Sequence, residues 1–159
     1  MADSINAGKL KNPMVLLATG FGAGCAPKAP GTAGTLVAIP FVYFMQQLSL
    51  EFYLVITVVT CVVGIVICDI AANKLGVHDH PGIVFDEIAG YFVTMIAAPT
   101  GWVWIVTGFV LFRVFDIIKP WPISILDKNV KGGVGIMVDD IVAGCFALVI
   151  LQLCAYYWA

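Results

Sequence analysis

Two pairs of adjacent acids, Asp86-Glu87 and Asp139-Asp140, stand where polar stretches of the sequence meet apolar ones. We expect each pair to open an apolar helix. One acid would be enough to stabilise a helix start, so two adjacent acids beside an apolar run exceed that need. Carboxylate oxygens suit Mg²⁺, which commonly binds proteins through carboxylates together with substrate phosphate. The four carboxylates are therefore our candidate Mg²⁺ ligands, with helix capping as the simpler alternative.

The single arginine of the chain opens a second motif, Arg113-x-x-Asp116-x-x-Lys119-Pro120. Spacings of three place Arg113 and Asp116 on one helical face. Pro120 predicts that Lys119 is the last residue of that helix. Arginine offers a planar bidentate fork and lysine a point charge, so the pair is a candidate phosphate binder. An internal ion pair with a snorkelling lysine is the alternative.

The segment His78-Asp79-His80 supplies groups that could accept a proton or bind a metal. We assign Asp79 or a flanking histidine as the general base, or as a group that binds metal or orients water. Asp116 and Asp127 are expected to orient the basic side chains or to join the metal shell.

A glycine-rich segment, residues 20–24, leads into a Pro- and Gly-containing stretch that includes Lys28 and Thr32. Its spacing is neither a dinucleotide-binding fingerprint nor a Walker A loop. Glycine-rich backbone before a helix can present N–H groups to an anion, and Lys28 would add positive charge. Thr32 is expected to cap the helix that follows. The alternative is a turn that needs Gly and Pro for its geometry.

The remaining sequence is strongly apolar. Hydrophobic residues make up 61% of the 159 residues and charged residues 11%, against about 25% charged in an average soluble domain. All but one of the 18 charged residues fall in the stretches 1–32, 69–87 and 113–140, and Glu51 is the exception. Lipid is therefore the expected solvent, and the net charge of −2 argues against a nucleic-acid partner.

The apolar runs 33–50, 52–68 and 141–158 are of near-spanning length. The run 88–112 contains Pro99-Thr100-Gly101, a turn signal that divides it into a hairpin. With this hairpin, all eight Lys and Arg residues lie on one side of the membrane. The positive-inside rule then places the N-terminus in the cytoplasm and the C-terminus outside.

The sequence thus predicts one all-α domain over residues 1–159, a polytopic membrane helical bundle. We expect about four to five membrane helices plus a short interfacial or re-entrant helix in residues 14–24. The hairpin arms, extended to residues 83–98 and 102–118, bring acids and Arg113 to membrane depth, where ionisable groups are usually functional. A structural subunit, or a small ion or metal transporter using these acids, is the alternative to an enzyme.

Several phosphatase signatures are absent, including Cys-x5-Arg and DxDx[TV], which leaves metal-assisted hydrolysis of a lipid phosphate. Three stretches together resemble the phosphatidylglycerophosphatase A family: GFGAGCAPKAPGTAGTL (20–36), GVHDHPGIVFDEIAG (76–90) and FRVFDIIKPWPISILDKNVKGGVGIMVDDIVAG (112–144). The resemblance implies a Mg²⁺-dependent, all-helical enzyme of the bacterial inner membrane. Such an enzyme would convert phosphatidylglycerophosphate into phosphatidylglycerol and inorganic phosphate, with membrane lipid as its other partner.

Overall fold

The computed structural model describes residues 5, 8–77 and 80–158, and every regular element in this part of the chain is a helix. The expected all-α fold is therefore confirmed. The helices are η1 (Lys9–Lys11), α1 (Pro13–Ala18), η2 (Ala23–Cys25), α2 (Pro30–Met45), α3 (Leu50–Leu75), α4 (Phe85–Thr94), α5 (Trp102–Ile118), α6 (Ile123–Asn129) and α7 (Gly132–Trp158).

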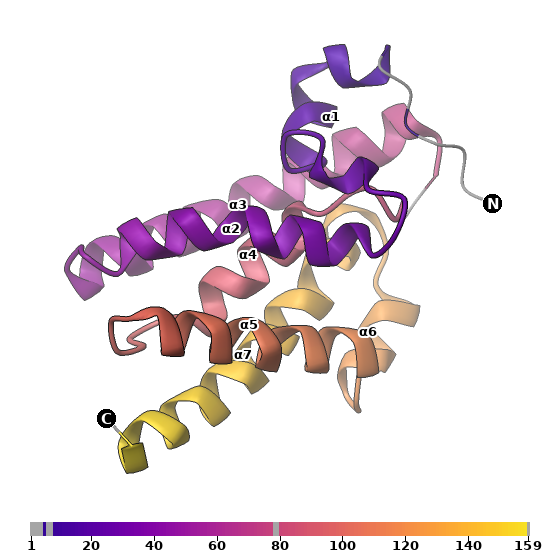
Figure 1. Cartoon of the computed structure of the whole chain (residues 1–159). Coiled ribbons are helices and arrows are strands. Elements are labelled where there is room, and N and C mark those ends of the chain that lie inside the picture. The colour runs from indigo at the N-terminus through magenta and orange to yellow at the C-terminus, as the bar shows by residue number, and fades with distance from the viewer. Residues whose placement is uncertain (1–4, 6–7, 78–79, 159) are drawn as a thin grey trace.

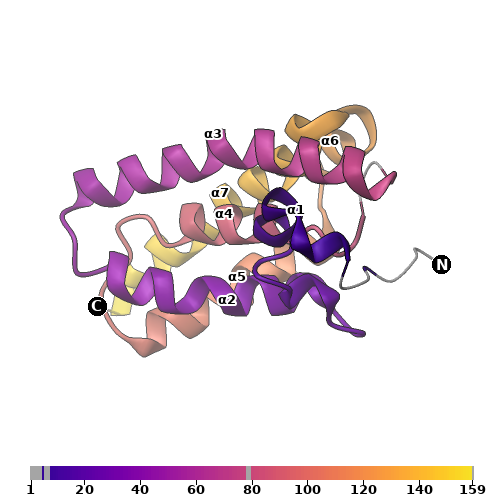
Figure 2. The ribbon, with the colours of Figure 1, turned by 90° about the horizontal axis from the view of Figure 1, so that it is seen from above.

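The long helices run back and forth between two ends of one bundle (Figure 1). The α2–α3 turn, the α4–α5 loop and the C-terminal end of α7 lie at one end, and α1, the α3–α4 connection and α6 lie at the other (Figures 1 and 2). The expected turn at residues 99–101 is found between α4 and α5. The charged stretches therefore gather at the α6 end, whereas Glu51 lies in the first turn of α3 at the opposite end.

Two helices in the described part of the chain are long and apolar enough to cross a membrane, namely α3 and α7, with mean hydropathies of 2.7 and 2.3. The shorter helix α2 has 16 residues, and α4 has ten. At 1.5 Å per residue α4 rises about 15 Å, half of the roughly 30 Å hydrocarbon core. The expected four to five membrane helices are thus not confirmed, because only α3 and α7 among the described residues have the required length and hydropathy.

Helix α7 packs against α3, α4, α5 and α6, and glycines let its backbone approach two of them closely. A Cβ on Gly133 would stand 1.9 Å from the Ile65 carbonyl oxygen of α3. A Cβ on Gly144 would stand 2.4 Å from the Gly90 carbonyl oxygen of α4. Small residues permit such contacts in apolar bundles, where packing replaces the hydrophobic effect. The two acidic pairs, one on α4 and one on α7, are brought together by this approach.

Helix α7 begins at Gly132, so the expectation that Asp139-Asp140 opens this helix is wrong by about two turns. The run of glycines at its start looks like a loop in the sequence, but Gly133 is needed for contact with α3. The helix start is stabilised from outside: the Gly133 backbone N–H donates to Asp69 Oδ1 of α3 at 3.0 Å. Asp69 therefore fixes the first turn of the helix that carries Asp139 and Asp140.

Replacing Asp69 should test this contact. We expect Asp69→Ala to lower the free energy of unfolding by about 1 kcal/mol, the usual effect of losing a cap. Asp69→Asn should lose less, because its amide oxygen can still accept from Gly133. Denaturant unfolding in detergent micelles, with Glu51→Ala as the control acid, measures both. Equal stability of Asp69→Ala and the wild type would show that Asp69 does not hold α7.

Candidate active site

A cavity of about 400 Å³ lies at the polar end of the bundle. Its walls come from the first turn of α2, the segment before α4, and helices α4 to α7. Charged side chains dominate this lining, and those in the described part of the chain are Asp86, Glu87, Arg113, Asp116, Lys119, Asp127, Asp139 and Asp140. The sequence predicted all eight as site residues, and the fold brings them to one place.

Three of these acids form the tightest group. Asp86, Glu87 and Asp140 each offer one carboxylate oxygen, and the three oxygens lie within 4.8 Å of one another. Glu87 Oε2 and Asp140 Oδ2 are buried and have no hydrogen-bond partner among the described residues. Buried polar atoms of this kind are costly unless something satisfies them. A cluster of converging carboxylate oxygens fits a hard divalent cation such as Mg²⁺.

The negative charges of this cluster also favour a bound cation. Buried oxygens of Glu87 and Asp140 lie close to each other and to Asp86. Like charges placed together away from water repel one another. Asp86 and Glu87 lie in the first turn of α4, whose N-terminal partial positive charge offsets only part of this repulsion. A bound cation would relieve the rest.

Arg113 lies between this cluster and Asp116. Its guanidinium donates to Asp116 Oδ2, as the spacing of three predicted, and lies 3.9 Å from Glu87 Oε1. The Arg113 side chain is 13% exposed. Its buried Nε–H has no hydrogen-bond acceptor among the described residues. Arg113 is thus held in place by two acids and keeps a donor for an anion in the cavity.

Lys119 joins three helices at the cavity. It follows α5 directly, one residue beyond the helix end rather than at it, in a left-handed conformation with φ of 44°. Its ammonium donates to Asp127 of α6 and to Asp139 of α7, each at 2.6 Å. Burial alone would lower the pKa of Lys119, but these two carboxylates raise it. Asp139, a predicted metal ligand, therefore uses Oδ2 to bind Lys119, whereas its buried Oδ1 has no partner among the described residues.

Two predicted phosphate binders lie beside the cavity rather than in its lining. Lys28 is exposed in the segment between η2 and α2, directly before Ala29, which lines the cavity. Thr32 lies in the first turn of α2, and its expected role as N-cap is wrong because Ala29 occupies that position. The helix starts earlier than expected because Pro30 suits the first helical turn. Phosphate binding by Lys28 and Thr32 stays a prediction.

His80 is buried and organises the segment before α4. Its Nδ1 accepts the Gly82 backbone N–H at 3.0 Å. This contact shapes the turn whose neighbours Pro81 and Ile83 line the cavity, but His80 itself is not in the lining. His78 and Asp79 lie outside the described residues. The catalytic assignments of these three residues stay predictions.

Sequence reasoning missed the steric role of Gly31. A Cβ at this position would stand 2.2 Å from Glu87 Oε1 and 3.1 Å from both terminal nitrogens of Arg113. The absence of a side chain thus lets α2 pack against the charged cluster. The glycine-rich character of this segment was visible in the sequence, but its spacing does not show which glycine meets which acid.

The fold and the cavity together define an all-helical protein with a carboxylate-rich site suited to a cation and a phosphate. The profile of the family described as Phosphatidylglycerophosphatase A matches residues 16–155. A phosphatidylglycerophosphatase A of Escherichia coli (strain K12) is 47% identical over 151 residues, covering 94% of this chain and 88% of the relative. A phosphatidylglycerophosphatase A of Haemophilus influenzae is 40% identical, covering 94% of this chain and 92% of the relative.

A third relative, from Bacteroides thetaiotaomicron, is provisionally named a phosphatidylinositol-3-phosphatase; it is 38% identical, with 87% of this chain and 91% of the relative covered. No solved structure matches the chain. The protein belongs to the phosphatidylglycerophosphatase A family.

Proposed function

We propose that this protein hydrolyses the terminal phosphate monoester of phosphatidylglycerophosphate, giving phosphatidylglycerol and inorganic phosphate, in phospholipid biosynthesis. The observation that carries the proposal is the single cavity in which the carboxylates of Asp86, Glu87 and Asp140 face the bases Arg113 and Lys119. Such a set can hold a cation and the phosphate that the cation binds. The proposed lipid substrate is the one that appears in the names of two relatives.

Asp86, Glu87 and Asp140 would hold Mg²⁺, with Asp139 beside them. A bound Mg²⁺ would neutralise phosphate charge and lower the pKa of a bound water. Arg113 would donate to the phosphate oxygens through its fork, and Lys119 would add a point charge. Asp116 and Asp127 hold these two bases in position through the contacts seen in the structure.

In this reaction the oxygen of a water molecule forms a new bond to phosphorus, and the bond from phosphorus to the glycerol oxygen breaks. The water gives up a proton, and the departing glycerol oxygen gains one. Asp79 or a flanking histidine, His78 or His80, is the proposed proton acceptor. In sequence these three residues directly precede Pro81, which lines the cavity.

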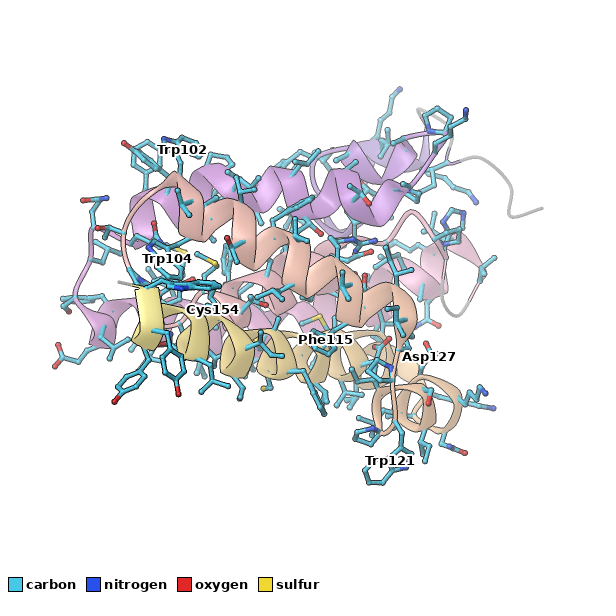
Figure 3. All side chains as sticks on the ribbon, turned by 60° about the horizontal axis from the view of Figure 1, so that its bottom comes forward. Trp102, Trp104, Phe115, Trp121, Asp127 and Cys154 are labelled. Atoms are coloured by element: carbon cyan, nitrogen blue, oxygen red, sulfur yellow. The ribbon has the colours of Figure 1, made fainter. Side chains whose placement is uncertain are left out.

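A bacterial inner membrane is the proposed location, with the cavity at the cytoplasmic face. Helices α3 and α7 would span the bilayer, and α2 and the α4–α5 hairpin would accompany them as further passes. Aromatic side chains mark the end of the bundle away from the cavity, where Figure 3 shows Trp102. The rings of Tyr43 and Trp102 stack at 5.4 Å, and Trp158, at the end of α7, is exposed. Aromatic residues are enriched at membrane–water interfaces.

The arrangement of the acids favours an enzyme over a transporter. The acids that line the cavity lie at one end of the bundle, and no other group of three or more metal-binding side chains occurs among the described residues. A transport pathway would need ionisable groups along the membrane normal. The hydrolytic reaction needs them only where the lipid headgroup meets the protein.

Phosphate release tests the proposal directly. Purified protein in detergent micelles should release inorganic phosphate from phosphatidylglycerophosphate when Mg²⁺ is present, and excess EDTA should abolish the release. Added Mg²⁺ should restore it. Phosphatidylinositol 3-phosphate, the lipid in the name of the third relative, serves as the competing substrate. If phosphate is released only from phosphatidylinositol 3-phosphate, the proposed substrate is wrong. If phosphate is released from neither lipid, the proposed function is wrong.

The site assignment predicts large losses of turnover. Asp86→Ala, Asp139→Ala and Arg113→Ala should each lower kcat by at least about 100-fold, the scale expected when a group that stabilises the transition state is removed. Glu51→Ala is the matched control, because this acid lies at the opposite end of the bundle. Near-normal activity in all three variants, with folding verified by thermal unfolding, would show that the reaction occurs elsewhere.

Gly31→Ala tests whether the close approach of α2 is needed. The added methyl would displace Glu87 and Arg113, so we expect kcat to fall by at least about tenfold, because small misplacements of catalytic groups have effects of this order or more. Gly34→Ala is the control for packing alone: its Cβ would meet Val84, 2.5 Å away, and not the charged groups. An equal ratio of activity loss to stability loss in both variants would show that Gly31 acts only through folding.

A further inference from the structure

We propose that the outer face of α6 binds the anionic surface of the bilayer and so holds the mouth of the cavity at the level of the lipid headgroups. The proposal rests on the proposed function for its lipid substrate. With this face we include the residues that continue it along the chain: Ile117 and Ile118 at the end of α5, Trp121 before α6, Ile125 and Lys128 in α6, and Lys131 before α7. Ile117 also lines the cavity.

The short helix α6 has two different faces. Ile123 is fully buried, and Asp127, four residues later, accepts from Lys119 at the cavity. Ile125 and Lys128, three residues apart, share another face of α6, which is exposed, and Trp121 stands in the turn just before the helix. The Trp121 side chain is 75% exposed, and Figure 3 shows it on the outside of α6, directed away from the bundle.

The apolar part of this surface extends onto the end of α5. Ile117 and Ile118 are 68% and 69% exposed, and they precede Trp121 by only a few residues. Val114, one turn before Ile118, is also exposed. The surface of α6 is therefore continuous with the apolar outer face of a long bundle helix, rather than an isolated patch.

The positive charge of this surface indicates that its partner is an anionic bilayer. Lys128 in the last turn of α6 and Lys131 just before α7 are exposed, and Asp127 of α6 is already bound by Lys119. An exposed indole on a segment that also carries lysines is typical of protein surfaces that lie in the headgroup region. Lysines near a membrane surface are attracted to anionic lipids. A bilayer containing anionic phospholipid offers this surface both an apolar layer for Trp121 and negative charge for the lysines.

The inner face of α6 makes this attachment relevant to the reaction. Asp127 links α6 to Lys119, and Lys119 also contacts Asp139 in the cavity. Anchoring the outer face therefore fixes the depth of the wall that carries these groups. A substrate headgroup at the same depth then meets Lys119 without leaving the bilayer.

Fluorescence tests the attachment without any assay of activity. The chain has four tryptophans, so the triple variant Trp102→Phe, Trp104→Phe, Trp158→Phe leaves Trp121 as the sole indole. In nanodiscs of phosphatidylglycerol and phosphatidylcholine, lipids brominated near the headgroup end of the acyl chain should quench its emission. Quenching by aqueous iodide but not by these lipids would overturn the proposal.

Kinetics test the consequence for the reaction. In anionic nanodiscs, Trp121→Ala and the double variant Lys128→Gln, Lys131→Gln should each raise KM for bilayer phosphatidylglycerophosphate several-fold with kcat little changed. Their KM for a short-chain, water-soluble substrate should stay that of the wild type. For the lysine variant, the rise should disappear in pure phosphatidylcholine nanodiscs. Trp102→Ala and Lys74→Gln are the matched controls outside this surface.

Each other outcome counts against the proposal. An equal loss on both substrates would assign the surface a structural role, and no change on either would remove its role altogether. If the wild type forms a dimer in nanodiscs and Trp121→Ala dissociates it, a second copy of the chain covers this surface. If the wild type releases no phosphate from either substrate, the proposed function fails, whereas the quenching result still decides whether α6 contacts the bilayer.

Discussion

Six carboxylates surround one cavity at the end of an apolar bundle, and the described residues supply two bases, Arg113 and Lys119, to compensate them. The surplus of negative charge is the constraint on which the site depends, because like charges at short range repel strongly away from water. Arg113 is shared between Asp116 and Glu87, and Lys119 between Asp127 and Asp139, so the two bases leave a surplus of acids at the cavity. This surplus is the reason for the proposal that a cation accompanies the phosphate into the cavity.

Helix α7 connects the charged cluster to the other helices of the bundle. It carries two of the acids in its third turn, and it must lie close enough to α4 for Asp140 to approach Asp86 and Glu87. Gly90 and Gly144 supply that approach on one side, and Gly133 supplies it against α3 on the other. Asp69 then holds the first turn of α7 from a neighbouring helix. Lys119 completes the connection by joining the end of α5 to α6 and α7. The polar site is thus built by backbone contacts at glycines and by a few charged side chains that link helices.

The sequence predicted the composition of the cavity better than its boundaries. Segregated charge and the turn at residues 99–101 were enough to place the acids and bases together, and all eight charged lining residues were expected. The starts of α2 and α7 were missed because Pro and Gly were assigned to turns. Pro30 instead occupies the first turn of α2, and the glycines from Gly132 belong to α7, where Gly133 packs against α3. The roles of Gly31 and Asp69 could not be predicted either, because each depends on a contact between segments far apart in the sequence. The number of membrane passes stays a prediction, because only α3 and α7 among the described residues are long and apolar enough to span by themselves.

Binding of a divalent cation by the isolated protein tests the central claim most directly, because it requires no substrate. Mn²⁺ can replace Mg²⁺ at oxygen ligands, and its binding can be followed by electron paramagnetic resonance in detergent micelles. The wild type should bind Mn²⁺ saturably, in competition with Mg²⁺, and Asp140→Asn should weaken this binding at least about tenfold, as loss of a direct ligand requires. Glu51→Gln should bind as the wild type does. Saturable binding that Asp140→Asn leaves unchanged, or no binding at all, would contradict the account.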